Sequence, residues 1–84
     1  MVTEQIIYDK LANDVPEFDQ ALIVDSSAGC GQSFDIVVVS NWFEGKNRLQ
    51  RSRAINKILK AEIAEMHAVR VKCYTVDEYA KLSA

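Results

Sequence analysis

Eighty-four residues, of which 49% are apolar and 26% charged, suffice for one domain with a single modest core and exclude a second one. The first residues lack the features of a secretory signal or a transit peptide. No apolar stretch approaches the roughly 20 residues that span a bilayer. We therefore expect residues 1–84 to form one cytoplasmic domain that makes no membrane contact.

The net charge of −2 conceals a strong asymmetry along the chain. Residues 46–60 contain six lysines and arginines and no acid, a charge of +6, so the remaining residues carry −8. Such a separation is typical of a docking surface or a phosphate-binding patch, and equally of an ordinary solvated helix face.

The first half of the chain predicts a helix and two strands. Thr3 is a good helix cap, and Pro16 stops the helix near residue 14. Residues 18–25 and 33–40 are predicted strands, with a loop of serines and glycines over 26–31 between them. The second strand is apolar on both faces, so we expect it to be central, either covered above and below or paired on both sides.

After a turn over residues 41–47, a helical segment is predicted to about residue 65. Leu49 and Arg51 are out of phase with the apolar face of that segment, Leu49 on its basic side and Arg51 on its apolar side. We therefore expect a short helical turn ending near Gln50, a break, and then the main helix.

Residues 67–74 alternate apolar and basic side chains, as a half-buried strand does. Thr75 and Glu78 then form a capping box that opens a last helix. The predicted order is α-β-β-α-α-β(-α), a small single α+β domain with a three-stranded mixed sheet packed by helices.

Helical crossovers usually join parallel strands, which places both strand starts at the same end of the sheet. Cys30 lies just before the second strand and His67, the only histidine, begins the third. These two residues should therefore be near neighbours. Cys73, in contrast, shares the phase of Val69 and Val71 and should face the core as a small apolar residue.

A cysteine beside a histidine is open to three interpretations. The pair is a metal site, a nucleophilic couple, or a loop cysteine next to an incidental histidine. For the nucleophilic couple, the sequence shows no orienting third group and no oxyanion hole. Two ligands cannot close a zinc site or an iron–sulfur cluster, so a partner or a small thiol would have to supply the rest.

The chain contains three motifs, Phe43-x-Gly45-Lys46-x-x-Leu49-x-Arg51-x-Arg53, His67-Ala68 and Tyr74-Thr75-x-x-Glu78-Tyr79. With these motifs it resembles the BolA-like proteins over nearly its whole length. Its loop, Gly29-Cys30-Gly31-Gln32-Ser33-Phe34, is similar to that of the fungal cytosolic branch, which works with glutaredoxins in iron regulation. One departure is Ser52, where many members have histidine.

The resemblance implies a fold similar to class II KH domains and a non-enzymatic role. It implies a heterodimer with a monothiol glutaredoxin that bridges a two-iron, two-sulfur cluster, with glutathione supplied by the partner. His67 would be a ligand of that cluster and Cys30 the second one from this chain. Iron-responsive or cluster-accepting proteins would act downstream, in the cytoplasm or the nucleus.

The alternative function is nucleic-acid binding by a transcriptional regulator, which the KH-like fold and the basic segment favour. Against it, the GxxG clamp of KH domains is absent and the chain as a whole is acidic. Under either function, the side chains expected to make the contact are those of Lys46, Arg48, Arg51 and Arg53.

Overall fold

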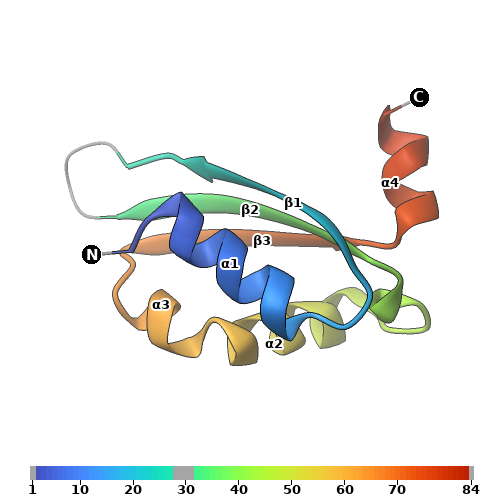
Figure 1. Ribbon diagram of the computed structural model, residues 1–84, viewed down its shortest axis with the longest axis horizontal. Coiled ribbons are helices and arrows are strands. Elements are labelled where there is room, and N and C mark those ends of the chain that lie inside the picture. Colours follow the sequence, from blue (N-terminus) through green and yellow to red (C-terminus); the bar gives the residue numbers. More distant parts are fainter. Residues whose placement is uncertain (1, 28–31, 84) are drawn as a thin grey trace.

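The computed structural model describes residues 2–27 and 32–83 (Figure 1). It confirms the predicted order of elements, with one additional 3₁₀ turn, η1, after the second strand. In chain order the elements are α1 (Glu4–Asp14), β1 (Phe18–Asp25), β2 (Ser33–Ser40), η1 (Asn41–Phe43), α2 (Arg48–Ile58), α3 (Lys60–Ala64), β3 (Ala68–Tyr74) and α4 (Val76–Ser83). No helix in these described ranges is both long and apolar enough to cross a membrane.

The sheet has the order β1-β2-β3, with β2 antiparallel to β1 and parallel to β3. The prediction that β2 is the central strand, paired on both sides, is confirmed. Ser33, the first residue of β2, pairs with Ala68, the first residue of β3. Both strands therefore start at the same end of the molecule, and α4 lies at the other end (Figure 1).

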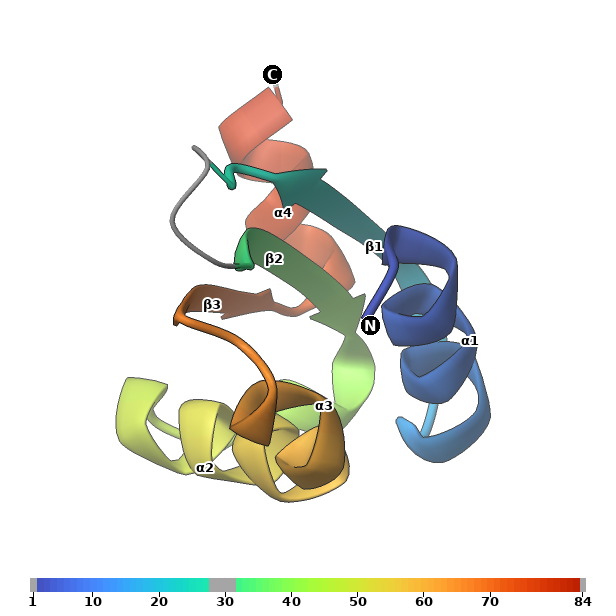
Figure 2. The ribbon, with the colours of Figure 1, turned by 90° about the vertical axis from the view of Figure 1, so that its left-hand side faces the viewer.

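The three helices α1, α2 and α3 cover one face of the sheet, and α4 lies on the other side (Figure 2). The covered face of β2 carries the core residues Phe34, Ile36 and Val38. On the opposite face, Leu22 and Val24 of β1 remain about half exposed. One layer of helices on one sheet face thus accounts for the core of this α+β domain.

The predicted break near Gln50 is wrong, because α2 runs without interruption from Arg48 to Ile58. Asn47 and Gln50 form a reciprocal capping box, which starts the helix at the first basic residues. The irregularity falls instead at Leu59, between α2 and α3.

The out-of-phase residues have a different explanation. Leu49 is simply exposed, with 57% of its surface accessible. Arg51 does point inward, where its guanidinium donates hydrogen bonds to backbone and carboxylate oxygens. An arginine on the buried side of a helix does not interrupt the helix when its N–H groups are hydrogen-bonded. The spacing of apolar residues along the helix cannot show whether such partners exist.

Candidate functional site

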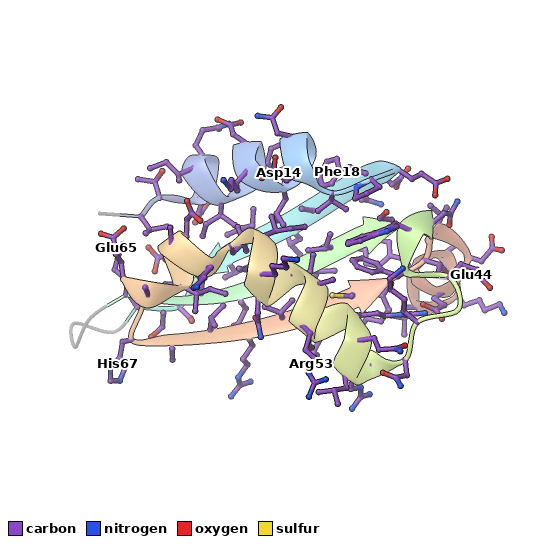
Figure 3. All side chains as sticks on the ribbon, turned by 90° about the horizontal axis from the view of Figure 1, so that it is seen from below. Asp14, Phe18, Glu44, Arg53, Glu65 and His67 are labelled. Carbon is purple, nitrogen blue, oxygen red and sulfur yellow. The ribbon has the colours of Figure 1, made fainter. Side chains whose placement is uncertain are left out.

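His67 lies at the start of β3, where two backbone hydrogen bonds fix its position. Its N–H donates to the carbonyl oxygen of Gln32 at 2.6 Å, and the N–H of Ala68 reaches the same oxygen at 3.3 Å. The side chain is exposed and points away from the ribbon (Figure 3). Within the described ranges, the imidazole has no hydrogen-bond or ion-pair partner, so both its nitrogens are accessible to a ligand.

Gln32 holds together the corner of the molecule where β2 and β3 start and where His67 lies. The sequence patterns did not single out this residue. Its side-chain amide donates to the Val2 carbonyl at 2.6 Å and accepts from the Val2 N–H at 3.0 Å. Its backbone carbonyl meanwhile holds His67. Gln32 thus ties the N-terminal segment to the starts of β2 and β3, a long-range link that no local pattern reveals.

Cys30 lies outside the described residues, so its predicted proximity to His67 stays a prediction. The geometric premise of that prediction is confirmed, because the starts of β2 and β3 are paired neighbours. Both flanks of the intervening loop are held as well. The Ser26 N–H donates to the Ser33 carbonyl at 2.8 Å, and the Ser33 N–H donates to Ser27 Oγ at 2.9 Å.

Asp25, at the end of β1, contributes to the same corner. Its Oδ1 accepts the Ser27 backbone N–H at 2.9 Å. Hydrogen bonds from Ser27 hold the pKa of the Asp25 carboxyl below its ordinary value. The sequence signal for this turn was present, because an aspartate followed by serines favours a side-chain-to-backbone turn.

The possible metal ligands near His67 fit a site that is shared with a partner better than a site that this chain completes alone. The described residues include no group of three or more His, Cys, Asp or Glu side chains that could hold a metal ion. His67 supplies one exposed nitrogen donor, and imidazole is a suitable ligand for iron. A complete set of ligands would therefore need Cys30 or groups from outside the chain.

The four predicted contact residues of the basic segment divide into two pairs. Lys46 and Arg51 are engaged within the chain. Lys46 Nζ donates to the Trp42 carbonyl at 3.0 Å and lies 4.7 Å from the centre of the Trp42 ring. Arg48 and Arg53 are exposed and form no ion pair with any described carboxylate.

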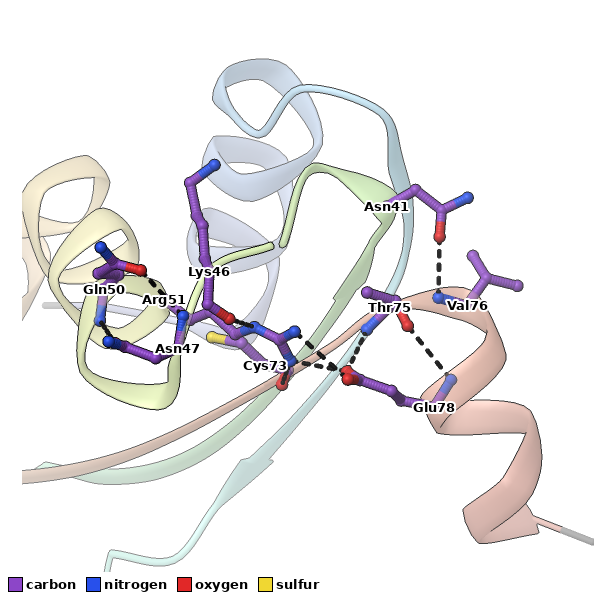
Figure 4. Close-up of polar contacts among 9 residues, drawn as sticks. All are labelled: Asn41, Lys46, Asn47, Gln50, Arg51, Cys73, Thr75, Val76 and Glu78. Atoms are coloured by element: carbon purple, nitrogen blue, oxygen red, sulfur yellow. Dashed lines mark hydrogen bonds and ion pairs between the residues drawn. The ribbon is translucent and has the colours of Figure 1, made fainter. Parts of the chain in front are cut away.

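Arg51 is the centre of a network at the far end of β3 (Figure 4). It donates to the Lys46 carbonyl at 2.8 Å, the Cys73 carbonyl at 3.2 Å, and Glu78 Oε1 at 2.6 Å. Glu78 Oε1 also accepts the Thr75 N–H at 2.9 Å, and Thr75 Oγ1 accepts the Glu78 N–H, which confirms the predicted capping box. The Arg51 hydrogen bond, helped by the Thr75 N–H, lowers the pKa of Glu78 to about 2.

Cys73 packs against the core, which confirms its expected orientation. Burial raises the pKa of its thiol to about 12, an effect that the nearby Arg51 charge only partly offsets. A thiol that stays protonated at neutral pH is a poor nucleophile and a poor metal ligand. Cys73 therefore differs from a reactive or ligating cysteine.

Together, the fold and this corner define a class of small α+β domains that present one exposed histidine where two parallel strands begin. Residues 17–78 match the family model described as BolA-like protein. The chain belongs to the BolA-like protein family.

Relatives support this assignment. BolA-like protein 2 of Saccharomyces cerevisiae is 49% identical over 81 residues, which cover 96% of this chain and 68% of the yeast protein. BolA-like protein 2 of Homo sapiens is 35% identical over 95% of this chain and 93% of its own length. The match to Arabidopsis thaliana Protein BOLA2 spans only 54% of that protein.

Solved structures show the same fold. A bol-like protein from Babesia bovis superposes with a TM-score of 0.88 at 33% identity, covering 100% of this chain and 96% of that one. The solution structure of yeast Fra2 has a TM-score of 0.75 at 49% identity, over 96% of this chain and 87% of that chain. These likenesses establish the small α+β fold with its three-stranded mixed sheet.

Proposed function

We propose that this chain is a non-enzymatic partner of a monothiol glutaredoxin, with which it holds a bridging two-iron, two-sulfur cluster. The observation that carries the proposal is His67, an exposed imidazole whose backbone is held by the carbonyl of Gln32, two positions after Cys30 in the sequence. Family membership and the 49% identity to yeast BolA-like protein 2 support it.

In this proposal the chain supplies His67, with Cys30 as the second ligand, and the glutaredoxin supplies its cysteine and a bound glutathione. The cluster provides a metal centre that can be sensed or transferred. The chain's contribution is to present a neutral imidazole nitrogen from a rigid strand start. A histidine in place of cysteine raises the reduction potential and can be displaced by protonation, which suits a cluster that must leave.

The division of ligands explains why the chain alone should not retain iron. Two side chains cannot close a four-coordinate site, and Cys73 is unavailable because its thiol is buried and protonated. Purified without a partner, the protein should contain no stoichiometric iron or zinc. Elemental analysis that finds about one tightly bound metal per chain would contradict the shared site.

The decisive test compares three variants, His67→Ala, Cys30→Ala and Cys73→Ala, each co-purified anaerobically with a monothiol glutaredoxin and glutathione. Visible circular dichroism should change most for His67→Ala, less for Cys30→Ala, and not for Cys73→Ala. Association should persist in all three, because the protein surfaces are intact. A wild-type spectrum for His67→Ala together with an altered one for Cys73→Ala would overturn the ligand assignment.

Nucleic-acid binding is the competing function, and Arg48 and Arg53 are its best test. Because both side chains are exposed and unpaired among the described residues, their removal should leave the fold unchanged. Under our proposal, Arg48→Ala with Arg53→Ala weakens glutaredoxin binding. Any affinity for DNA or RNA should be weak and fall steeply with salt. A sequence-specific nucleic-acid complex that survives physiological salt would favour the competing function.

A further inference from the structure

The outer edge of β3 carries no partner strand in the described part of the chain. In the order β1-β2-β3, only β2 pairs with it. The N–H of Ala68 points toward β2, because it donates to the Gln32 carbonyl. Backbone groups alternate in direction along a strand, so those of Val71 and Cys73 point outward. The Cys73 carbonyl does accept a bond from Arg51, on the outer side, as this alternation requires.

Three of these outward groups remain available. The N–H and C=O of Val71 and the N–H of Cys73 have no hydrogen bond to another element in the described ranges. Exposed strand edges with free donors and acceptors are templates for a further strand.

A groove of about 890 Å³ runs along this same edge. Its floor is residues 70–74 of β3, and its two sides are the first turns of α2 and the face of α4 that carries Lys81 and Leu82. At about 3.3 Å per residue, such a stretch accommodates roughly five extended residues. Leu82 is 63% exposed and adds an apolar contact at one end.

The lining of the groove is strongly positive. Arg48, Arg70, Lys72 and Lys81 are exposed, and none of them is in an ion pair with a described carboxylate. The single acid in the lining, Glu78, is already neutralised by Arg51. The cations stand on both sides of the strand edge, because Arg48 belongs to α2 whereas Arg70 and Lys72 project from the sheet face that α2 does not cover.

We propose that this groove binds an extended acidic segment of a partner protein as an additional strand on β3. The main chain of that segment pairs with Val71 and Cys73. Its side chains alternate between the two faces, where carboxylates meet Arg48 on one and Arg70 with Lys72 on the other. The site goes beyond the proposed cluster ligands and uses neither His67 nor Cys30.

The test uses labelled synthetic peptides and fluorescence anisotropy on the full chain. The peptide EEVEEVEE should bind, and its lysine counterpart KKVKKVKK should not. The peptide EEPEEPEE keeps every carboxylate but lacks one backbone N–H on each of its edges, because its two prolines fall on opposite edges. It should bind at least tenfold more weakly. Equal affinity for the proline peptide would reduce the site to simple charge attraction and overturn the proposal.

Two pairs of charge reversals, matched in net charge, locate the site. Arg70→Glu with Lys72→Glu should weaken binding of EEVEEVEE at least tenfold, whereas Lys57→Glu with Lys60→Glu, outside the groove, should change it less than threefold. If the strand variant does not fold, Arg48→Glu with Lys81→Glu makes the same test from the helices. Equal loss in the groove and control pairs would contradict the proposal.

Amide hydrogen exchange supplies the structural readout. On binding, the amides of Val71 and Cys73 should become protected, whereas those of Arg70 and Lys72, already directed at β2, should change little. Absence of protection at Val71 and Cys73 would exclude strand addition. Tighter binding of a labelled oligothymidine than of EEVEEVEE would identify the groove as a nucleic-acid site instead.

Discussion

The two ends of β3 use their side chains in opposite ways. At its start, His67 is fixed through backbone atoms alone as far as the described residues go, and its imidazole remains exposed. At its end, Arg51 and Glu78 satisfy one another and the neighbouring backbone. Consequently, the side chains at the far end should matter for stability, and the side chain at the start should matter for what the protein binds.

The largest effect on stability is expected for Arg51→Ala. The Arg51 side chain is only 14% exposed, and its loss removes a hydrogen-bond donor from the Lys46 and Cys73 carbonyls and the ion pair from Glu78. We expect the free energy of unfolding to fall by about 2 kcal/mol, the scale for hydrogen bonds to a charged group. Urea denaturation followed by far-UV circular dichroism measures this loss. The exposed Arg53→Ala is the control, and equal losses for the two variants would contradict the distinction.

A smaller effect is expected for Thr75→Ala, at the first turn of α4. Thr75 is buried, and its hydroxyl accepts the Glu78 N–H at 3.2 Å. Removal of a helix-capping hydroxyl costs about 1 kcal/mol. The same urea titration should show that loss for Thr75→Ala and near wild-type stability for Thr75→Ser. If Thr75→Ser is as unstable as Thr75→Ala, packing of the methyl group rather than the cap is responsible.

A third effect depends on pH. Because Arg51 lowers the pKa of Glu78 to about 2 from the ordinary 4.5, the ionised carboxylate stabilises the folded state. That contribution is complete above about pH 4.5 and is lost as the pH falls toward 2. Glu78→Gln should therefore lower the unfolding free energy at pH 7 and converge with wild type near pH 2. In an Arg51→Ala background the substitution should have a smaller effect, because only Thr75 then favours the ionised carboxylate, and an unchanged effect there would exclude Arg51 as the main cause.

The smallest effect on stability is expected for His67→Ala. An exposed side chain without described contacts contributes within about 0.5 kcal/mol. Thermal and urea unfolding of the free chain should therefore match wild type, although the cluster spectrum of the heterodimer changes. A large loss of stability in the free chain would show that His67 is structural, and the comparison between the two ends of β3 would fail.

Much of this architecture was predictable from local patterns. Local patterns located β1, β2 and β3 to within one residue, because short apolar runs bounded by turn residues and, in β3, the alternation of apolar and basic side chains are typical of strands. The caps at Thr3 and Thr75 were predictable because they satisfy donors within three residues along the chain. The shared end of the β2 and β3 starts followed from connectivity, and the pairing of Ser33 with Ala68 bears it out.

What local patterns did not decide are contacts between residues far apart in the chain. Arg51 reaches Glu78, 27 positions away, and Gln32 reaches Val2, 30 positions away. The first contact explains why Arg51, although out of phase with the apolar face, does not interrupt α2. The second contact fixes the N-terminal segment to the starts of β2 and β3, next to His67. By itself, then, the sequence determined the helices and strands, their order, and the face of β3 on which the Cys73 side chain lies. Only the tertiary structure decided which basic side chains form hydrogen bonds and ion pairs within the chain and which remain exposed for binding. The reason is that these bonds need acceptors from distant parts of the sequence, which only folding brings close.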